Sequence, residues 1–247
     1  MSPSYTYDGD MMKLKTVYWI LFAVLALSFG IVFFSAFSNV AAHTSAEAEA
    51  SAPHIIIDAG HGGEDGGAEV DGVLEKNINL TISQKVADIL RLSGYTVDEI
   101  REMDAAVYDG DAETLREKKV SDLKNRVTTF NESDRNLVVS IHQNKFDNSA
   151  YSGTQVFYSV NNPKGSVLAE AIRRSVVSLL QPDNTRELKP AGSDIYILDN
   201  ATVPAVIVEC GFLSNPEERQ KLLDEKYQGE MAYSIAMGVL EYLTANN

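Results

Sequence analysis

The sequence contains a single cysteine, Cys210, among its 247 residues. An internal disulfide needs two cysteines and a thiolate zinc cluster needs several, so both are excluded. Histidine is also scarce, with four in the whole chain. One of them, His43, lies in a stretch of Ala, Ser and Glu outside the expected fold. Any metal ion must therefore be held by a few histidines together with carboxylates.

The chain also has few positively charged residues relative to negatively charged ones. The chain has 21 Lys and Arg against 35 Asp and Glu, which gives a formal net charge of -14. Nucleic acids and anionic membrane surfaces need clustered cations to neutralise their phosphates, so we expect no nucleic-acid partner. The Gly-x-Ser-x-Gly elbow of many serine hydrolases is also absent, which argues against that class of enzyme.

Near the amino terminus, one hydrophobic stretch, residues 17–37, has no charged residue and follows Lys13 and Lys15. Its length matches the roughly 20 residues that a helix needs to cross a bilayer and favours an uncleaved anchor. Cleavage after a small residue within 39–42 is the alternative. The preceding lysines keep the amino terminus inside, so the remainder is expected to be exported. The predicted organisation is a cytoplasmic segment (1–16), an anchor or signal sequence (17–37), a linker (38–53) and a folded domain (54–247).

The domain alternates strand and helix patterns over its whole length. Apolar β-branched runs predict strands, and apolar residues three or four apart predict helices. This alternation indicates one α/β domain with a mainly parallel or mixed sheet. Residues 101–122 are mostly polar and are expected to form a loop with helical pieces. The predicted strands are 55–58, 95–100, 136–142, 153–160, 195–198 and 205–208, and the helices are 75–92, 120–133, 164–180, a helix starting at 216, and 231–243.

Three polar side chains follow or end predicted strands. His61 comes after 55–58 within a glycine-rich loop, His142 ends 136–142, and Glu209 follows 205–208. Glu75 opens the first helix, close behind the glycine loop. Because ligands of open α/β sheets bind at the carboxyl ends of the strands, we expect these residues to converge. Two imidazoles and one carboxylate suit catalytic zinc, and the remaining carboxylate can act as a general base.

Each of these residues has an ordinary structural alternative. His61 could be a solvated histidine in a turn, His142 a satisfied core histidine, and Glu75 an exposed acid at a helix start. Glu209 is harder to dismiss, because an unpartnered carboxylate between apolar residues is costly. Strand alternation places Cys210 on the opposite face, where a small core residue is expected.

Four sequence blocks resemble those of the zinc-dependent N-acetylmuramoyl-L-alanine amidases, in the same order and over essentially the whole domain. They are Asp58-Ala-Gly-His61-Gly-Gly, Glu75-Lys-x-x-Asn-Leu80, Ser140-Ile-His142-Gln-Asn144 and Val203-Pro-Ala-Val-Ile-Val-Glu209-Cys-Gly-Phe-Leu-Ser-Asn215. The resemblance implies a twisted sheet of about six strands flanked by helices. It also implies one zinc ion bound by His61, Glu75 and His142, with Glu209 catalytic.

The implied substrate is peptidoglycan, cleaved between N-acetylmuramic acid and L-alanine of the stem peptide. The segment from Tyr108 to Arg126 is similar to the spore-cortex members, which help to form muramic δ-lactam. This similarity predicts action outside the cytoplasm, at the membrane surface or in the forespore intermembrane space. Arg126 and Asn144 are candidates for positioning substrate, although an exposed helical arginine is the alternative for Arg126. Whether a protein partner activates the enzyme is left open.

Three alternatives stay open at this point. The chain could be a vegetative cell-wall amidase, a silent peptidoglycan-binding module on the same fold, or a zinc peptidase acting within the stem peptide. A silent module is expected to lack one of the four site residues, and all four are present. Analysis of the reaction products distinguishes the amidase from the peptidase.

Overall fold

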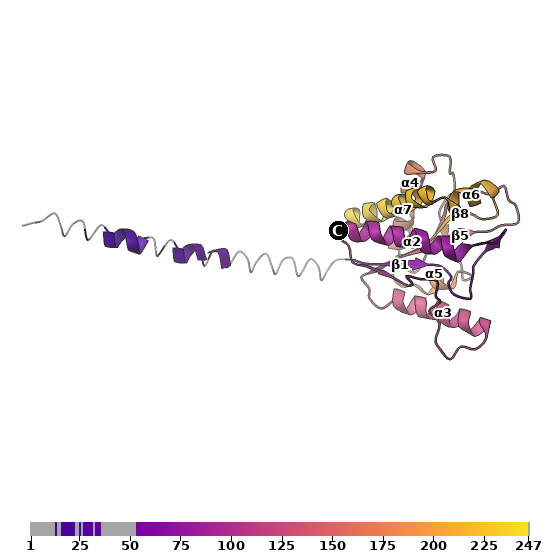
Figure 1. Ribbon diagram of the computed structural model, residues 1–247, viewed down its shortest axis with the longest axis horizontal. Helices are drawn as coiled ribbons and strands as arrows, with labels where there is room; N and C mark the ends of the chain where they lie inside the picture. Colours follow the sequence, from indigo (N-terminus) through magenta and orange to yellow (C-terminus); the bar gives the residue numbers. More distant parts are fainter. Residues whose placement is uncertain are drawn as a thin grey trace, which may run out of the picture. The chain divides into compact units, whose positions relative to one another are not determined.

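The structure, a computed structural model, describes residues 13, 16–22, 25, 27–31, 33–35 and 53–246 (Figure 1). Residues 53–247 form a unit separate from residues 1–52. Within the described part of the amino-terminal unit, the helix Thr16–Ser35 has a mean hydropathy of 2.5 and is long enough to cross a membrane. The proposed boundaries at 37 and 53 adjoin residues outside the described set, and they remain predictions.

Six strands form one sheet in the order β4-β1-β5-β8-β6-β7. Each neighbouring pair is parallel except β8 and β6, which are antiparallel. The predicted mixed, mostly parallel sheet is thus confirmed. Two further strands pair as a small antiparallel hairpin, β2 (Glu69–Val70) with β3 (Val73–Leu74). The sheet strands are β1 (His54–Ala59), β4 (Val97–Glu99), β5 (Asn136–Asn144), β6 (Gln155–Tyr158), β7 (Lys189–Pro190) and β8 (Ala205–Phe212).

Helices cover both faces of this sheet (Figure 1). One face packs against α2 (Glu75–Leu92), α4 (Lys164–Leu179) and α7 (Glu225–Asn246), and the other packs against α3 (Leu115–Phe130) and α5 (Tyr196–Asn200). Each face of the sheet has its own hydrophobic core, the first beneath α2, α4 and α7 and the second beneath α3 and α5. The alternation of side chains along each strand determines which of the two cores a residue belongs to. In β1, Ile55 and Ile57 belong to the first core, whereas Ile56 belongs to the second. Burial on both faces explains why β1, β5 and β8 are almost continuously apolar.

Several predicted elements differ from the structure. The strand β7 was not predicted, α7 begins at Glu225 instead of 231, and β8 continues to Phe212 instead of ending at 208, so Glu209 lies within it. Residues 195–198 were predicted as a strand, but α5 is a short helix in which Asp199 N donates to Ile195 O at 2.9 Å. A four-residue apolar run fits a buried strand and a buried helical turn equally well, so its periodicity misled the prediction. The helix α3 also begins earlier than predicted, at Leu115 instead of near 120, because Thr114 and Glu117 form a capping box.

The last short helix, α6 (Pro216–Leu223), begins as the sequence predicts. The Asn215 side chain accepts hydrogen bonds from the backbone of Glu217 and Glu218 at 3.0 and 3.1 Å. Glu218 stands where the acid of a capping box would return a hydrogen bond to the cap residue, and the sequence suggests such a bond, but the structure does not contain it. Its carboxylate instead accepts from the backbone N of Gly153 and of Phe212, both at 2.8 Å. Glu218 thereby ties the end of β8 to the loop that precedes β6.

A buried ionic network lies beneath the end of β1. Asp58 is 0% exposed and Arg126, from α3, is 2% exposed, and the two form an ion pair. The Ser140 hydroxyl donates to Asp58 at 2.6 Å, and Asp122 pairs with the Arg126 Nε at 2.6 Å. Burial opposes the charge of Asp58, but Arg126 and Ser140 more than offset it and hold the Asp58 pKa below its ordinary value.

Replacing one partner of this buried pair should be costly. Asp58→Ala leaves the Arg126 guanidinium with only one carboxylate, and we expect a loss of about 3 to 5 kcal/mol in the free energy of unfolding, measured by urea denaturation. Asp98→Ala is the control, because its side chain on the neighbouring strand β4 is 66% exposed; it should cost less than about 1 kcal/mol. Equal losses for the two variants would contradict the structural role of the Asp58 pair.

Candidate metal centre

His61 is placed by an unusual backbone path directly after β1. Its own φ is +63°, and those of Gly62 and Gly63 are +139° and +57°. Three successive residues with positive φ reverse the direction of the chain. Paired backbone hydrogen bonds between Gly62 and Asp65, at 3.0 and 3.1 Å, close the turn. Glycine adopts such angles freely, whereas histidine does not. The loop therefore holds His61 in a strained conformation that other contacts must stabilise.

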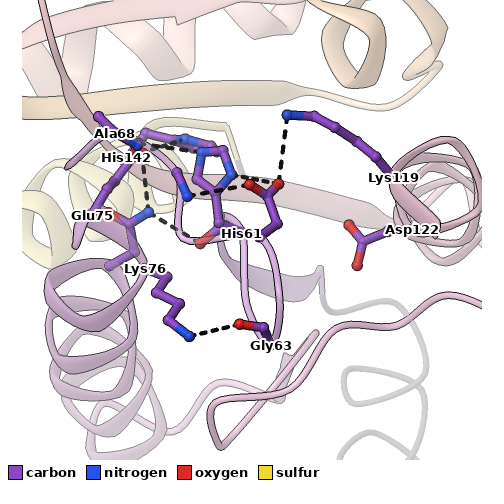
Figure 2. A network of polar contacts seen from close by, with 12 residues as sticks. His61, Gly63, Ala68, Glu75, Lys76, Lys119, Asp122 and His142 are labelled. Atoms are coloured by element: carbon purple, nitrogen blue, oxygen red, sulfur yellow. Dashed lines mark hydrogen bonds and ion pairs between the residues drawn. The ribbon is translucent and has the colours of Figure 1, made fainter. Parts of the chain in front are cut away.

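The structure brings His61, Glu75 and His142 together at the carboxyl ends of β1 and β5 (Figure 2). Nε2 of His61 lies 3.3 Å from Glu75 Oε2, and Nδ1 of His142 lies 2.9 Å from Glu75 Oε1. The imidazole centroids are 5.0 Å apart, and one potential ligand atom from each residue lies within 4.8 Å of the others. The predicted convergence of these three side chains is thus seen in the geometry.

Glu75 is fixed by more than the two histidines. Oε2 accepts from Ala68 N at 2.7 Å, and Oε1 accepts from Gln143 N at 3.0 Å and from Asn79 Nδ2 at 3.2 Å. Burial raises the pKa of this carboxyl, but the neighbouring His142 and His61 outweigh burial and hold the pKa far below its ordinary value. Glu75 is therefore an ionised, immobile acceptor and not the exposed helix-start acid of the alternative reading.

Asp65 orients His61 from the other side of the imidazole. Its Oδ2 lies 2.9 Å from His61 Nδ1, and the exposed Lys119 lies 3.6 Å from the same oxygen (Figure 2). Burial lowers the pKa of His61, but Asp65 and Glu75 outweigh burial and raise it to about 9. Since a metal ion needs a neutral imidazole, an ion held by His61 would displace a proton from it.

Glu209 lies on the strand next to His142 but is not one of the three clustered potential ligands. Its Cα pairs in register with that of His142 on the neighbouring strand, and its Oε2 is buried with no hydrogen-bond partner among the described residues. Burial raises its pKa to about 7, with a further rise from Glu75 and opposition from His142. A buried carboxylate oxygen without a partner is costly. The donor set of two imidazoles and one carboxylate, with this orphaned oxygen beside it, fits a catalytic zinc ion.

The polar segment after β4, whose role the sequence did not reveal, holds the His61 loop in place. Arg101 is 4% exposed and donates to Ala59 O at 2.9 Å, Gly60 O at 3.1 Å and Lys76 O at 2.8 Å. Asp104 accepts from Gly63 N at 2.9 Å and from the Lys76 ammonium at 2.7 Å. These contacts link the loop to α2, so they stabilise both sides of the site at once.

Arg126 and Asn144 lie near the site in different settings. Arg126 is buried, so the expectation of an exposed helical arginine is wrong; its Nη2 donates to His61 O at 2.9 Å and its other contacts include Asp58 and Asp122. These contacts support a role in positioning the loop. Asn144 ends β5, where its backbone O accepts from Leu213 N at 2.8 Å. The predicted role of Arg126 and Asn144 in positioning substrate remains a prediction.

The sequence reasoning gave no role to four supporting residues, Asp65, Asn79, Arg101 and Gln143, although Asn79 and Gln143 lie within two of the quoted sequence blocks. Asp65 had a local signal, since it follows His61 by four residues within the same glycine loop. Gln143 follows a predicted ligand directly. Arg101 had no comparable signal, because its partners are backbone oxygens of distant segments. Cys210 is buried, and burial raises the pKa of its thiol, in agreement with a core residue and not a nucleophile.

Comparisons with known proteins agree with this geometry. The family model for N-acetylmuramoyl-L-alanine amidase matches residues 55–241. The germination-specific N-acetylmuramoyl-L-alanine amidase of Bacillus subtilis is 32% identical, over 93% of this chain and 96% of that protein.

The chain is also similar to solved structures of amidases. The CwlD amidase of Clostridioides difficile, solved in complex with the GerS lipoprotein, is 39% identical with a TM-score of 0.74, over 78% of this chain and 99% of that one. An N-acetylmuramoyl-L-alanine amidase of Clostridium difficile is 30% identical with a TM-score of 0.68, over 80% of this chain and 100% of that one.

The close contact between Gly60 and His142 leaves no room for a side chain at position 60. A Cβ there would lie 2.2 Å from Cε1 and Nε2 of His142, so Gly60→Ala must displace that imidazole. We expect the affinity for zinc, measured by competition with a chelating dye, to fall at least about tenfold. Gly110→Ala is the matched control, because nothing lies within 4 Å of its added Cβ. Unchanged zinc affinity in Gly60→Ala would contradict the placement of His142 in the metal centre.

Proposed function

The chain belongs to the N-acetylmuramoyl-L-alanine amidase family, and on that premise we propose that it hydrolyses the amide between N-acetylmuramic acid and L-alanine of the stem peptide. The observation that carries this proposal is the convergence of His61, Glu75 and His142 within 4.8 Å, beside the unpartnered carboxylate of Glu209. A module that only binds peptidoglycan has no need for a costly orphaned carboxylate, so this arrangement favours a hydrolase.

His61, Glu75 and His142 are the residues that would hold a zinc ion in this proposal. The bound ion supplies Lewis-acid activation of the scissile carbonyl and of water. Glu75 contributes negative charge, and its hydrogen bonds to Ala68 and Gln143 keep it in position. Asp65 keeps the ring of His61 in one orientation through Nδ1. The loop contacts of Arg101 and Arg126 preserve this geometry during turnover.

Glu209 is the proposed general base. It takes a proton from the attacking water and then donates that proton to the nitrogen of L-alanine as the amide bond breaks. A pKa near 7 suits both steps, because the carboxyl can gain and lose the proton close to neutral pH.

We further propose a role in the spore cortex and a place outside the cytoplasm. The similarity to a germination-specific amidase over nearly the full length supports the cortex role. The helix Thr16–Ser35 supports attachment to the membrane through the amino terminus. The C. difficile relative was solved with the GerS lipoprotein, so an accessory protein partner belongs to this proposal.

Product analysis tests the proposed reaction. We would incubate the full chain, in detergent, with purified peptidoglycan, and analyse the products by mass spectrometry with added zinc and with a chelator. Intact stem peptides that begin with L-alanine, released only with zinc, are the expected products. Fragments cut within the stem would identify a peptidase instead. No release from either vegetative or cortex peptidoglycan, despite bound zinc, would point to a missing activating partner or to the silent module.

Two substitutions should separate catalysis from metal binding. Glu209→Gln removes the base but keeps the three ligands, so we expect normal zinc content and a fall in kcat of about 10² to 10⁴. His142→Ala removes a ligand and should lose both zinc and activity. Zinc content is measured by atomic emission on the same preparations. Substantial activity in Glu209→Gln would refute its assigned role, and normal zinc in His142→Ala would refute the ligand set.

A further inference from the structure

The hairpin formed by β2 and β3 adjoins the metal centre, and its position bears directly on Glu75. The Ala68 N–H, one residue before β2, donates to Glu75 Oε2 at 2.7 Å, and the Glu75 N–H donates to Ala68 O at 2.9 Å (Figure 2). A Cβ on Gly67 would lie 2.6 Å from the same carboxylate oxygen. Both ends of the hairpin therefore meet at a side chain that we propose as a zinc ligand.

The hairpin has little within itself to fix its tip. Each strand has two residues, and so small a two-stranded sheet is marginally stable at best in water. Val70 and Val73 are partly buried against the first core, whereas Asp71 and Gly72 at the turn are exposed. Both turn residues have positive φ, at +52° and +78°. The tip therefore depends on contacts from other elements.

Arg219, on α6, makes such a contact. Its Nη2 donates to Asp71 Oδ2 at 2.6 Å, and its Nη1 donates to Leu213 O, directly after β8, at 2.7 Å. The arginine side chain is 16% exposed, so it has less freedom than an arginine on the open surface. Lys145, the residue after β5, adds a second contact to the hairpin, from Nζ to Glu69 O at 3.1 Å. The Arg219 guanidinium thus joins the tip of the hairpin to the chain beyond β8.

These contacts close a ring that contains two of the proposed zinc ligands. Asn144 follows His142 by two residues in β5, and its O accepts from Leu213 N at 2.8 Å. At the other end of the ring, Glu75 Oε1 lies 2.9 Å from His142 Nδ1. The Arg219 pair with Asp71 links the strand side of this ring to the hairpin side. In order, the ring runs through His142, Asn144, Leu213, Arg219, Asp71, Ala68 and Glu75.

Arg219 has an alternative role, which is to fasten α6 to the end of β8. One nitrogen suffices for that, since Nη1 alone reaches Leu213 O. The second nitrogen holds Asp71, whose side chain is 76% exposed and contributes nothing to the packing of α6. Asp71 therefore offers a way to release the hairpin without disturbing the helix or the core.

We propose that Arg219 is a positioning residue for Glu75: it latches the β2–β3 hairpin to α6, and the latched hairpin keeps the Ala68 N–H on Glu75 Oε2. This inference rests on the zinc-binding part of the proposed function and adds a residue of α6 to it. When the latch opens, Glu75 loses a hydrogen bond that orients it, and zinc leaves the site more readily. Arg219 acts on the metal centre through Glu75 and not by direct contact.

The test is a double-mutant cycle on the full chain in detergent, with Asp71→Asn, Arg219→Met and both together. Asn tolerates the left-handed backbone at position 71. Zinc-loaded protein is mixed with excess chelating dye, and the rate of zinc release is measured. We expect Asp71→Asn to speed release about threefold, a modest change because one partner of the ion pair is exposed. In the Arg219→Met background it should have no further effect, since its partner is already gone.

Hydrogen exchange of the Ala68 amide reports on the latch without any metal. This amide is protected by its bond to Glu75, and mass spectrometry of zinc-free protein measures its exchange rate. Asp71→Asn should raise that rate about threefold in the wild-type background only, with an unchanged temperature of unfolding. If Arg219 serves α6 alone, Arg219→Met lowers the temperature of unfolding while Ala68 exchange does not respond to Asp71→Asn, and the latch is refuted.

Two controls accompany the cycle. Glu69→Gln removes the same charge from the same hairpin and should leave zinc release and Ala68 exchange unchanged, which separates the latch from a general effect of charge on zinc. Arg219→Lys keeps a cation near Asp71 and should recover part of the loss seen in Arg219→Met. Equal acceleration by Asp71→Asn in both backgrounds, or by Glu69→Gln, would overturn the proposal.

The latch and the proposed function fail separately. If the wild-type protein binds no zinc, the proposed metal centre fails, and Ala68 exchange in the zinc-free protein still decides the latch. If zinc binds and muramoyl amides are cleaved, but neither zinc release nor Ala68 exchange responds to Asp71→Asn, the latch is rejected and the amidase proposal stands.

Discussion

The site depends on one constraint, which is that the loop following β1 lies very close to strand β5. Gly60 has no room for a Cβ against His142, and His61 adopts a left-handed backbone. A left-handed residue other than glycine costs about 1 to 2 kcal/mol. Arg101 and Arg126 offset this cost, because they donate to the carbonyl oxygens of Ala59, Gly60 and His61. The position of His61 at this edge of the sheet therefore depends on a loop conformation that two buried arginines stabilise.

Much of this architecture could be predicted from the sequence, because its signals are local. Apolar β-branched runs marked β1, β5 and β8, and the residues at their ends gave His61, His142 and Glu209. The helical period placed Glu75 at the first position of α2. Parallel pairing then brings these strand ends to one edge, so convergence follows from topology. The resemblance in four sequence blocks agreed with the same residues.

The rest could not be predicted because it depends on partners far apart in the chain. Arg126 looked like a helical surface residue until its pairing with Asp58, 68 positions away, was seen. Arg101 and Asp104 lie in a polar segment without periodicity, yet both hold the glycine loop. The short helix α5 was mistaken for a strand for a different reason, since four apolar residues carry too little periodicity.

We propose that His61, Glu75 and His142 hold a zinc ion while Glu209 stays free to move protons. A crystal structure of the zinc-loaded protein, with anomalous data on both sides of the zinc absorption edge, tests it most directly. We expect a single strong anomalous peak bonded to these three side chains, with the Glu209 carboxylate outside bonding distance. A peak bonded to Glu209, or one placed elsewhere while these three residues keep their mutual hydrogen bonds, would contradict it.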